Sequence, residues 1–72
     1  NIYPNPTNGN TLFFNLTKDA RINIYNILGK LVKTAEVKAS NNTLDIATLN
    51  KGIYILKINS GVYFTTKKLL VN

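Results

Sequence analysis

The sequence predicts an all-β protein, a small antiparallel β-sandwich. Short segments in which apolar and polar residues alternate recur along the chain, as expected for half-buried strands. Turn-forming residues separate these segments at roughly 8- to 12-residue spacing, which is typical of sandwiches. No segment has the apolar periodicity of a helix of convincing length. The pattern predicts about six strands, or about seven if the stiff segment around Ile2 and Tyr3 also pairs.

Length and composition limit the class of protein. The 72 residues make one domain, and a domain of this size buries only about 60% of the surface that its unfolded chain exposes. There is no cysteine, so neither a disulfide nor a cysteine-based metal site supplements the core. The net charge of +6 suits either a solvated basic surface or an anionic partner. Because no apolar run approaches the ~20 residues that span a bilayer, we expect no membrane insertion.

The first ten residues are expected to form a stiff leading segment that marks the domain start. Each of its two prolines fixes its own φ and holds the preceding residue extended, and an Asn-Gly pair then makes a turn. Residues 11–16 follow as the first long alternating segment. Leu12, Phe14 and Leu16 share one face of this predicted strand, and the sandwich proper extends over 11–71.

The clearest half-buried strand is predicted at 20–27, where Ile22 and Ile24 face inward. A short hairpin connection follows at 26–30, in which Gly29 suits the positive φ that a tight loop requires.

Two more strands are predicted at 31–38 and 43–47, with a loop between them. In the first of these strands Leu31, Ala35 and Val37 share one face. In the second, Leu44 and Ile46 are expected to point inward, and Leu49 is expected to be tucked under the turn that follows.

The most apolar segment, 52–58, is expected to be the central strand, because β-branched and aromatic residues suit a pleated sheet. One face carries Tyr54, Leu56 and Ile58, and the other face also carries isoleucine, so both faces are expected to be covered.

Residues 59–61 have the spacing of a three-residue hairpin loop, and 62–71 are expected to pair back as the final strand. In that strand Lys67 has the same parity as Leu69 and Val71, which breaks the simple alternation. Either a bulge re-aims the side chains, or the strand lies at a sheet edge where a lysine reaches solvent. We favour the edge strand.

Catalytic chemistry is not recognisable in the sequence, so we expect neither an enzyme nor a cofactor nor a bound metal. Histidine and cysteine are absent. The acidic residues Asp19, Glu36 and Asp45 fall in different predicted elements, which leaves no carboxylate pair and no calcium-type cluster. Ser40 and Ser60 are interpreted as loop serines.

The aromatic residues have two interpretations. They could form a stacking platform for a sugar or a nucleic acid, but packing in the core is favoured because they fall within predicted strands. These residues are Phe13, Phe14, Tyr25, Tyr54, Tyr63 and Phe64.

Four segments stand in order along the chain: Tyr3-Pro4-Asn5-Pro6 with Gly9, Ile24-Tyr25-Asn26-Ile27-Leu28-Gly29-Lys30-Leu31-Val32, Leu49-Asn50-Lys51-Gly52-Ile53-Tyr54, and Thr66-Lys67-Lys68-Leu69-Leu70-Val71. Their order and spacing resemble the type A C-terminal sorting domain of the type IX secretion system, which many secreted proteins of the Bacteroidota carry. The resemblance covers essentially the whole chain. The residues that match the family's structural motif are Tyr3, Pro4, Asn5, Pro6, Gly9, Gly29, Lys30, Gly52 and Tyr54.

The resemblance implies an immunoglobulin-like sandwich that is a single sorting domain, 1–72, excised from a longer secreted protein. It implies a monomeric, non-catalytic signal that takes a cargo on its N-terminal side through the periplasm to the cell surface or the medium. The implied partners are the outer-membrane type IX translocation machinery and a sortase-like peptidase that removes the domain and attaches many cargos to an anionic lipopolysaccharide. The implied recognition residues lie in the last strand: Lys67, Lys68, Leu69, Leu70 and Val71.

Three other functions remain open from the sequence. A carbohydrate- or surface-binding module of a secreted enzyme would need aromatic rings exposed in a row. A basic nucleic-acid module is supported by charge alone, and we expect no nucleic-acid partner. A structural spacer would show no export defect when deleted.

Overall fold

Seven β-strands are formed by the described residues, 2–3 and 10–72, in the computed structural model, and this part of the chain contains no helix. Three strands make one sheet in the order β1-β2-β5, and four make the other in the order β4-β3-β6-β7, with every pairing antiparallel. The strands are β1 (Ile2–Tyr3), β2 (Thr11–Phe14), β3 (Ala20–Asn26), β4 (Leu31–Val37), β5 (Thr43–Asp45), β6 (Gly52–Ser60) and β7 (Tyr63–Val71).

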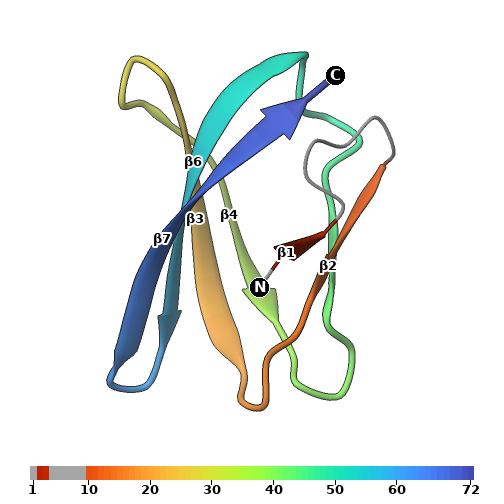
Figure 1. Ribbon diagram of the computed structural model, residues 1–72, viewed down its shortest axis with the longest axis vertical. Helices are drawn as coiled ribbons and strands as arrows, with labels where there is room; N and C mark the ends of the chain where they lie inside the picture. Colours follow the sequence, from red (N-terminus) through yellow and green to blue (C-terminus); the bar gives the residue numbers. More distant parts are fainter. Residues whose placement is uncertain (1, 4–9) are drawn as a thin grey trace.

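The two sheets face each other as the layers of a sandwich (Figure 1). The first, second and fifth strands lie in one layer, and the third, sixth and seventh lie in the other with the fourth beside the third. This is an immunoglobulin-like distribution of strands. The predicted fold class is therefore confirmed, and the segment at Ile2–Tyr3 supplies the seventh strand by pairing with β2.

The core lies between the layers and is built by alternation within each strand. Ile22 and Ile24 on β3 and Leu56 on β6 are completely buried, which confirms the predicted inward faces of both strands. Leu16, Ala35 and Leu49 are half-buried against this core. Its members are Leu12, Phe14, Ala20, Ile22, Ile24, Val37, Leu44, Ile46, Tyr54, Leu56, Ile58, Leu69 and Val71.

The start of β4 departs from simple alternation. Lys33 lies opposite Ile24, but the next residue of β3, Tyr25, lies opposite Leu31, so Val32 is the extra residue of a bulge. Directly opposite residues point to the same face, so Leu31 is on the outer face with Tyr25 and is 48% exposed. The prediction that Leu31 shares a face with Ala35 and Val37 was wrong, because the bulge reverses the direction of its side chain.

The central strand was predicted correctly in position, since β6 lies between β3 and β7, but only one of its faces is covered. Ile53 is exposed and Ile55 is half-buried. These two residues lie on the outer face of the four-stranded sheet, where no described element packs. An apolar outer face is therefore left open to solvent.

The last hairpin is tighter than the sequence suggested. Ser60 pairs with Tyr63, so the loop has two residues, Gly61 and Val62, and not three. Gly61, the first loop residue, has a φ of +65°, whereas Val62, like every other described residue that is not glycine, does not have a positive φ. This is the pattern of a type II′ turn with glycine first. The pairing of β6 with β7 then runs to Gly52 without a register shift. The predicted edge position of the last strand is confirmed, and the alternative bulge is not present.

Candidate functional site: the terminal hairpin

The predicted recognition residues of β7 are divided between the two faces of the sheet. Leu69 lies opposite Tyr54 and is fully buried, whereas Leu70 lies opposite Ile53 and is 38% exposed. Val71 is buried at the end of the strand. Two of the five residues therefore anchor the strand in the core.

The two lysines of this set also point to opposite faces. Lys67 lies opposite the buried Leu56, on the core side, and Lys68 lies opposite Ile55, on the outer face. Both lysines are exposed, because Lys67 lies on an edge strand and extends past the core into solvent. Together with Leu70 they make a basic and apolar strip along β7.

The core side of β7 is buried only at its C-terminal end. Tyr63 is 55% exposed, Thr65 is half-buried, Lys67 is exposed, and Leu69 and Val71 are buried. The hairpin is thus fixed to the core at one end, and its turn extends to the opposite end of the molecule (Figure 1).

Three of the sequence motifs meet at the fixed end of the hairpin. Tyr54 on β6 pairs with Leu69 on one side and with Asn26 on the other, so one row across the sheet joins segments distant in sequence. Gly52, which pairs with Val71, has a φ of +150°, a backbone conformation that is strained for residues with a Cβ. Because glycine tolerates this conformation, the chain can pass from the turn before β6 into the strand at a position directly opposite the end of β7.

Tyr54 has a role that the sequence interpretation missed. Its ring is buried, and its hydroxyl donates a 2.7 Å hydrogen bond to the carbonyl oxygen of Asn50. A tyrosine at the start of the sixth strand that bonds back to the preceding corner is the tyrosine corner of immunoglobulin-like sandwiches. The signal was present in the sequence, as a tyrosine four residues after Asn50 between a turn and a strand.

The β3–β4 turn has the geometry that the sequence predicted. Gly29 has a φ of +85°, and its N–H donates to the carbonyl oxygen of Asn26 at 3.0 Å. The side-chain oxygen of Asn26 accepts the N–H groups of Leu28 and Lys30, each at 3.0 Å. Asn26 and Gly29 therefore define the turn, and the side chain of Lys30 is exposed.

The leading motif is placed only in part. Tyr3 lies in β1 opposite Phe13 of β2. The rest of the predicted motif, Pro4, Asn5, Pro6 and Gly9, lies outside the described residues.

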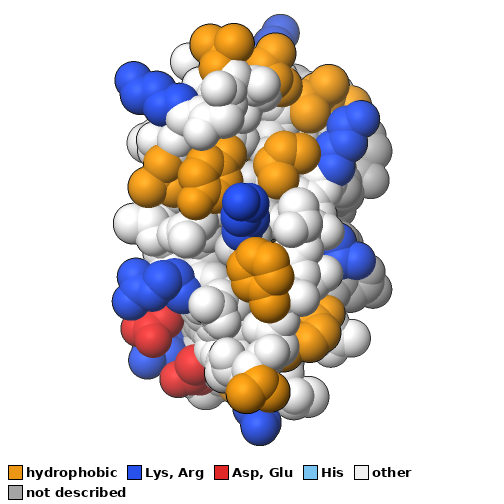
Figure 2. All heavy atoms as spheres, turned by 90° about the vertical axis from the view of Figure 1, so that its left-hand side faces the viewer, with side chains coloured by type: hydrophobic (Ala, Val, Ile, Leu, Met, Phe, Trp, Pro, Cys, Tyr) orange, Lys and Arg blue, Asp and Glu red, His pale blue; other side chains and the backbone are white. Residues whose placement is uncertain are grey.

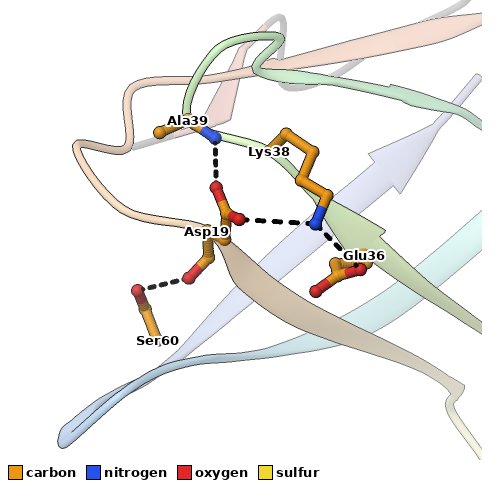
Figure 3. A network of polar contacts seen from close by, with 5 residues as sticks. All are labelled: Asp19, Glu36, Lys38, Ala39 and Ser60. Atoms are coloured by element: carbon orange, nitrogen blue, oxygen red, sulfur yellow. Dashed lines mark hydrogen bonds and ion pairs between the residues drawn. The ribbon is translucent and has the colours of Figure 1, made fainter.

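A polar network ties the loops at the other end of the sandwich (Figure 3). The Asp19 carboxylate accepts the Ala39 N–H at 2.9 Å and contacts the Lys38 Nζ at 3.4 Å, and Lys38 also contacts Glu36 at 3.3 Å. The Ala39 hydrogen bond, with help from Lys38, lowers the pKa of Asp19 below its ordinary 3.8. The hydrogen bonds that Lys38 donates to Glu36 and Asp19 raise the pKa of Lys38 above 10.5.

Ser60 belongs to this network, which corrects its interpretation as a loop serine. It is the last residue of β6, is 9% exposed, and donates from Oγ to the backbone oxygen of Asp19 at 2.7 Å. The start of β3 is thereby held against the end of β6, and the serine has a structural role.

The expectation that the aromatic residues pack in the core was wrong for four of the six, because Tyr25 lies half-buried on the outer face of the sheet and three others are exposed. Phe14 and Tyr54 are buried, but Phe13, Tyr63 and Phe64 are exposed. Phe64 lies opposite Asn59 and Tyr63 opposite the buried Ser60, so neighbouring rings point to opposite faces. These rings do not form a row for stacking on a sugar.

The described residues hold no group of three or more His, Cys, Asp or Glu side chains placed to bind a metal ion. The same part of the chain has no helix of the length and apolarity needed to cross a membrane.

Comparison with known proteins agrees with the four-segment resemblance. The family model for the secretion system C-terminal sorting domain matches residues 1–72, the whole chain. A search of curated proteins found no match.

Proposed function

The chain belongs to the family of secretion system C-terminal sorting domains, and we propose that the type IX machinery reads the C-terminal part of its β6–β7 hairpin. As a member, the chain is a type IX sorting signal, and the protein that carries it is exported to the cell surface or secreted. The usual context of the family is the Bacteroidota, and its domains are generally non-catalytic. Membership also implies a cargo in cis and contact with the type IX machinery.

The observation that supports this proposal is that the C-terminal part of β7 carries both buried and exposed side chains. Leu69 and Val71 are buried, so they hold the strand in register beside β6. Lys67, Lys68 and Leu70 are exposed on the same stretch. A partner that approaches this edge of the sheet meets two positive charges and one apolar side chain. Their spacing is fixed because the buried residues hold the strand in register, so the partner can recognise both the charge and the arrangement of these side chains.

We further propose that a sortase-like peptidase acts on the N-terminal side of the domain after export, and that the cargo is then attached to an anionic lipopolysaccharide. The domain acts as a monomer and uses no cofactor. In this proposal the sandwich serves as a removable sorting signal.

The test is export of a reporter fused to the N-terminus of the chain. Replacing both Lys67 and Lys68 by Glu reverses the charge of the strip and leaves the core anchors in place. We expect the reporter to accumulate in the periplasm. Removal of residues 67–72 should have the same effect, although it also removes Leu69 and Val71 from the core.

The matched control is the double variant Lys18→Glu and Lys51→Glu, which makes the same change in net charge at two exposed sites outside β7. We expect export of this control as efficient as that of the unchanged fusion. Unchanged secretion of the Lys67 and Lys68 variant, or equal loss in the control, would contradict the proposal that this strip is read.

A further inference from the structure

The tip of the β3–β4 hairpin exposes aliphatic side chains that the fold does not use. Ile27 is 74% exposed and Leu28 is 88% exposed. The turn itself is formed by Asn26 and Gly29, through backbone hydrogen bonds and the side-chain oxygen of Asn26. Because neither aliphatic side chain takes part in these hydrogen bonds or packs in the core, the pair calls for an explanation outside the fold.

Basic and apolar residues continue from the tip onto the outer face of the four-stranded sheet. Leu31 is turned outward by the bulge and is 48% exposed. Lys30 follows the tip, and Lys57 lies on the outer face with its Nζ 5.1 Å from the centre of the Tyr25 ring. We call Ile27, Leu28, Leu31, Lys30 and Lys57 the tip surface. A hollow of about 280 Å³, lined in part by Ile27 and Lys57, joins the tip to the sheet face.

Among the described residues, the Asp and Glu side chains lie away from the tip surface. Asp19 and Glu36 contact Lys38 in the network at the other end of the sandwich, and Asp45 lies on the other sheet, where it accepts the N–H of Ala47. In Figure 2, which looks onto the outer face of the four-stranded sheet, apolar and basic side chains are interspersed over the upper part and acidic side chains lie at the lower left. The local charge is therefore positive, and it disfavours a second copy of the same surface.

We propose that the tip surface docks on an anionic lipid membrane surface. The turn that carries the aliphatic pair lies at one end of the molecule (Figure 1) and is held by hydrogen bonds, and both side chains are exposed. Exposed aliphatic side chains at such an end can enter a fluid interface that needs no complementary cavity. Lysines beside it are attracted to anionic headgroups. A stable protein partner would instead need an interface of about 800 Å² per side. This is contact with a membrane surface and does not involve a membrane-spanning segment.

The test is cosedimentation of the purified 72-residue chain with phosphatidylcholine vesicles, with and without phosphatidylglycerol. We expect binding to the vesicles that contain phosphatidylglycerol, and weaker binding as salt rises. The double variant Ile27→Ser and Leu28→Ser should lower the partition coefficient at least about tenfold. Lys30→Glu, which removes one positive charge and adds a negative one, should lower it by more than about fivefold.

Two control variants make the same kinds of change away from the tip surface. Val62→Ser alters a fully exposed aliphatic residue at the β6–β7 turn, and Lys18→Glu alters an exposed lysine in the β2–β3 connection. Each should change binding less than about twofold, since neither side chain is near the tip. Thermal unfolding of every variant, followed by circular dichroism, checks that the sandwich is intact.

Three results would overturn the proposal. The first is no binding to either kind of vesicle, which would leave an acidic protein as the occupant. The second is an equal loss of binding in the two controls, which would mean non-specific attraction by net charge. The third is self-association of the free chain that the Ile27 and Leu28 variant abolishes, which would assign the surface to a second copy. The proposal does not depend on the sorting function, because the vesicle experiment can fail or succeed whatever the export assay shows.

Discussion

The hydroxyl group of Tyr54 joins the corner before β6 to the strand that holds the terminal residues. Its ring lies in the core, and its hydrogen bond to Asn50 satisfies a polar atom on a largely buried side chain. The same residue pairs with Leu69. A change at this hydroxyl therefore affects the corner and, through the strand, the anchor of the proposed recognition strip.

We predict that Tyr54→Phe lowers the free energy of unfolding by about 1 to 2 kcal/mol, because the ring is kept and one partly buried hydrogen bond is lost. Urea unfolding measures this difference. The matched control is Tyr63→Phe, at a side chain that is 55% exposed, where a change within about 0.5 kcal/mol is expected. Equal effects of the two substitutions would show that the corner bond does not contribute.

At the scale of elements, the Asp19 network connects the segment before β3 to the segment after β4 and to the end of β6. The carboxylate joins the start of β3 to the segment after β4, and Ser60 joins the end of β6 to the backbone of Asp19. Both ion pairs of Lys38 are more than half exposed, so they add little by themselves. The backbone hydrogen bonds give this network its structural value.

The network predicts a pH dependence of stability. The pKa of Asp19 is lower in the folded chain than its ordinary 3.8, so its contribution is fully present above about pH 4 and is lost as the pH falls through the lowered value. Asp19→Asn keeps an acceptor for Ala39 but has no charge to titrate. The stability difference between the original chain and this variant should therefore be constant near neutral pH and should shrink below about pH 4, as measured by urea unfolding. A difference that is unchanged at the acid end would contradict this assignment.

Alternation within single strands was enough to predict most elements, and pairing between strands explains what was missed. The inward residues of β3, β5 and β6 follow from period two alone. The outward turn of Leu31 depends on the bulge opposite β3, which no local pattern reveals. The exposure of Tyr63 depends on where the core ends beneath β7, and this too is a property of the assembled sheets.

The candidate site shows the same limit. The parity of Lys67, Leu69 and Val71 was visible in the sequence, and the edge position that explains it was predicted. In the sequence, Ile27 and Leu28 are simply part of a turn motif, because a turn pattern does not predict how exposed its side chains are. The hydroxyl bond of Tyr54 likewise required the position of the corner.

At the scale of the whole molecule, the sandwich separates three tasks by position. The core fixes the end of β7, and the Asp19 network closes the opposite end. The β3–β4 turn lies at the same end of the molecule as the end of β7, on the other side of β6 (Figure 1). A chain with a net charge of +6 places its acidic side chains away from both proposed contact regions. Charge distribution, more than total charge, therefore distinguishes these regions from an ordinary solvated surface.

The most direct test of the central claim is to fuse the 72-residue chain to the C-terminus of a periplasmic reporter in a bacterium that has the type IX system. The account predicts that the reporter reaches the cell surface or the medium, and that it stays in the periplasm in a strain without the outer-membrane translocation channel. A reporter that remains in the periplasm of the competent strain, or that is exported equally without the channel, would contradict the account.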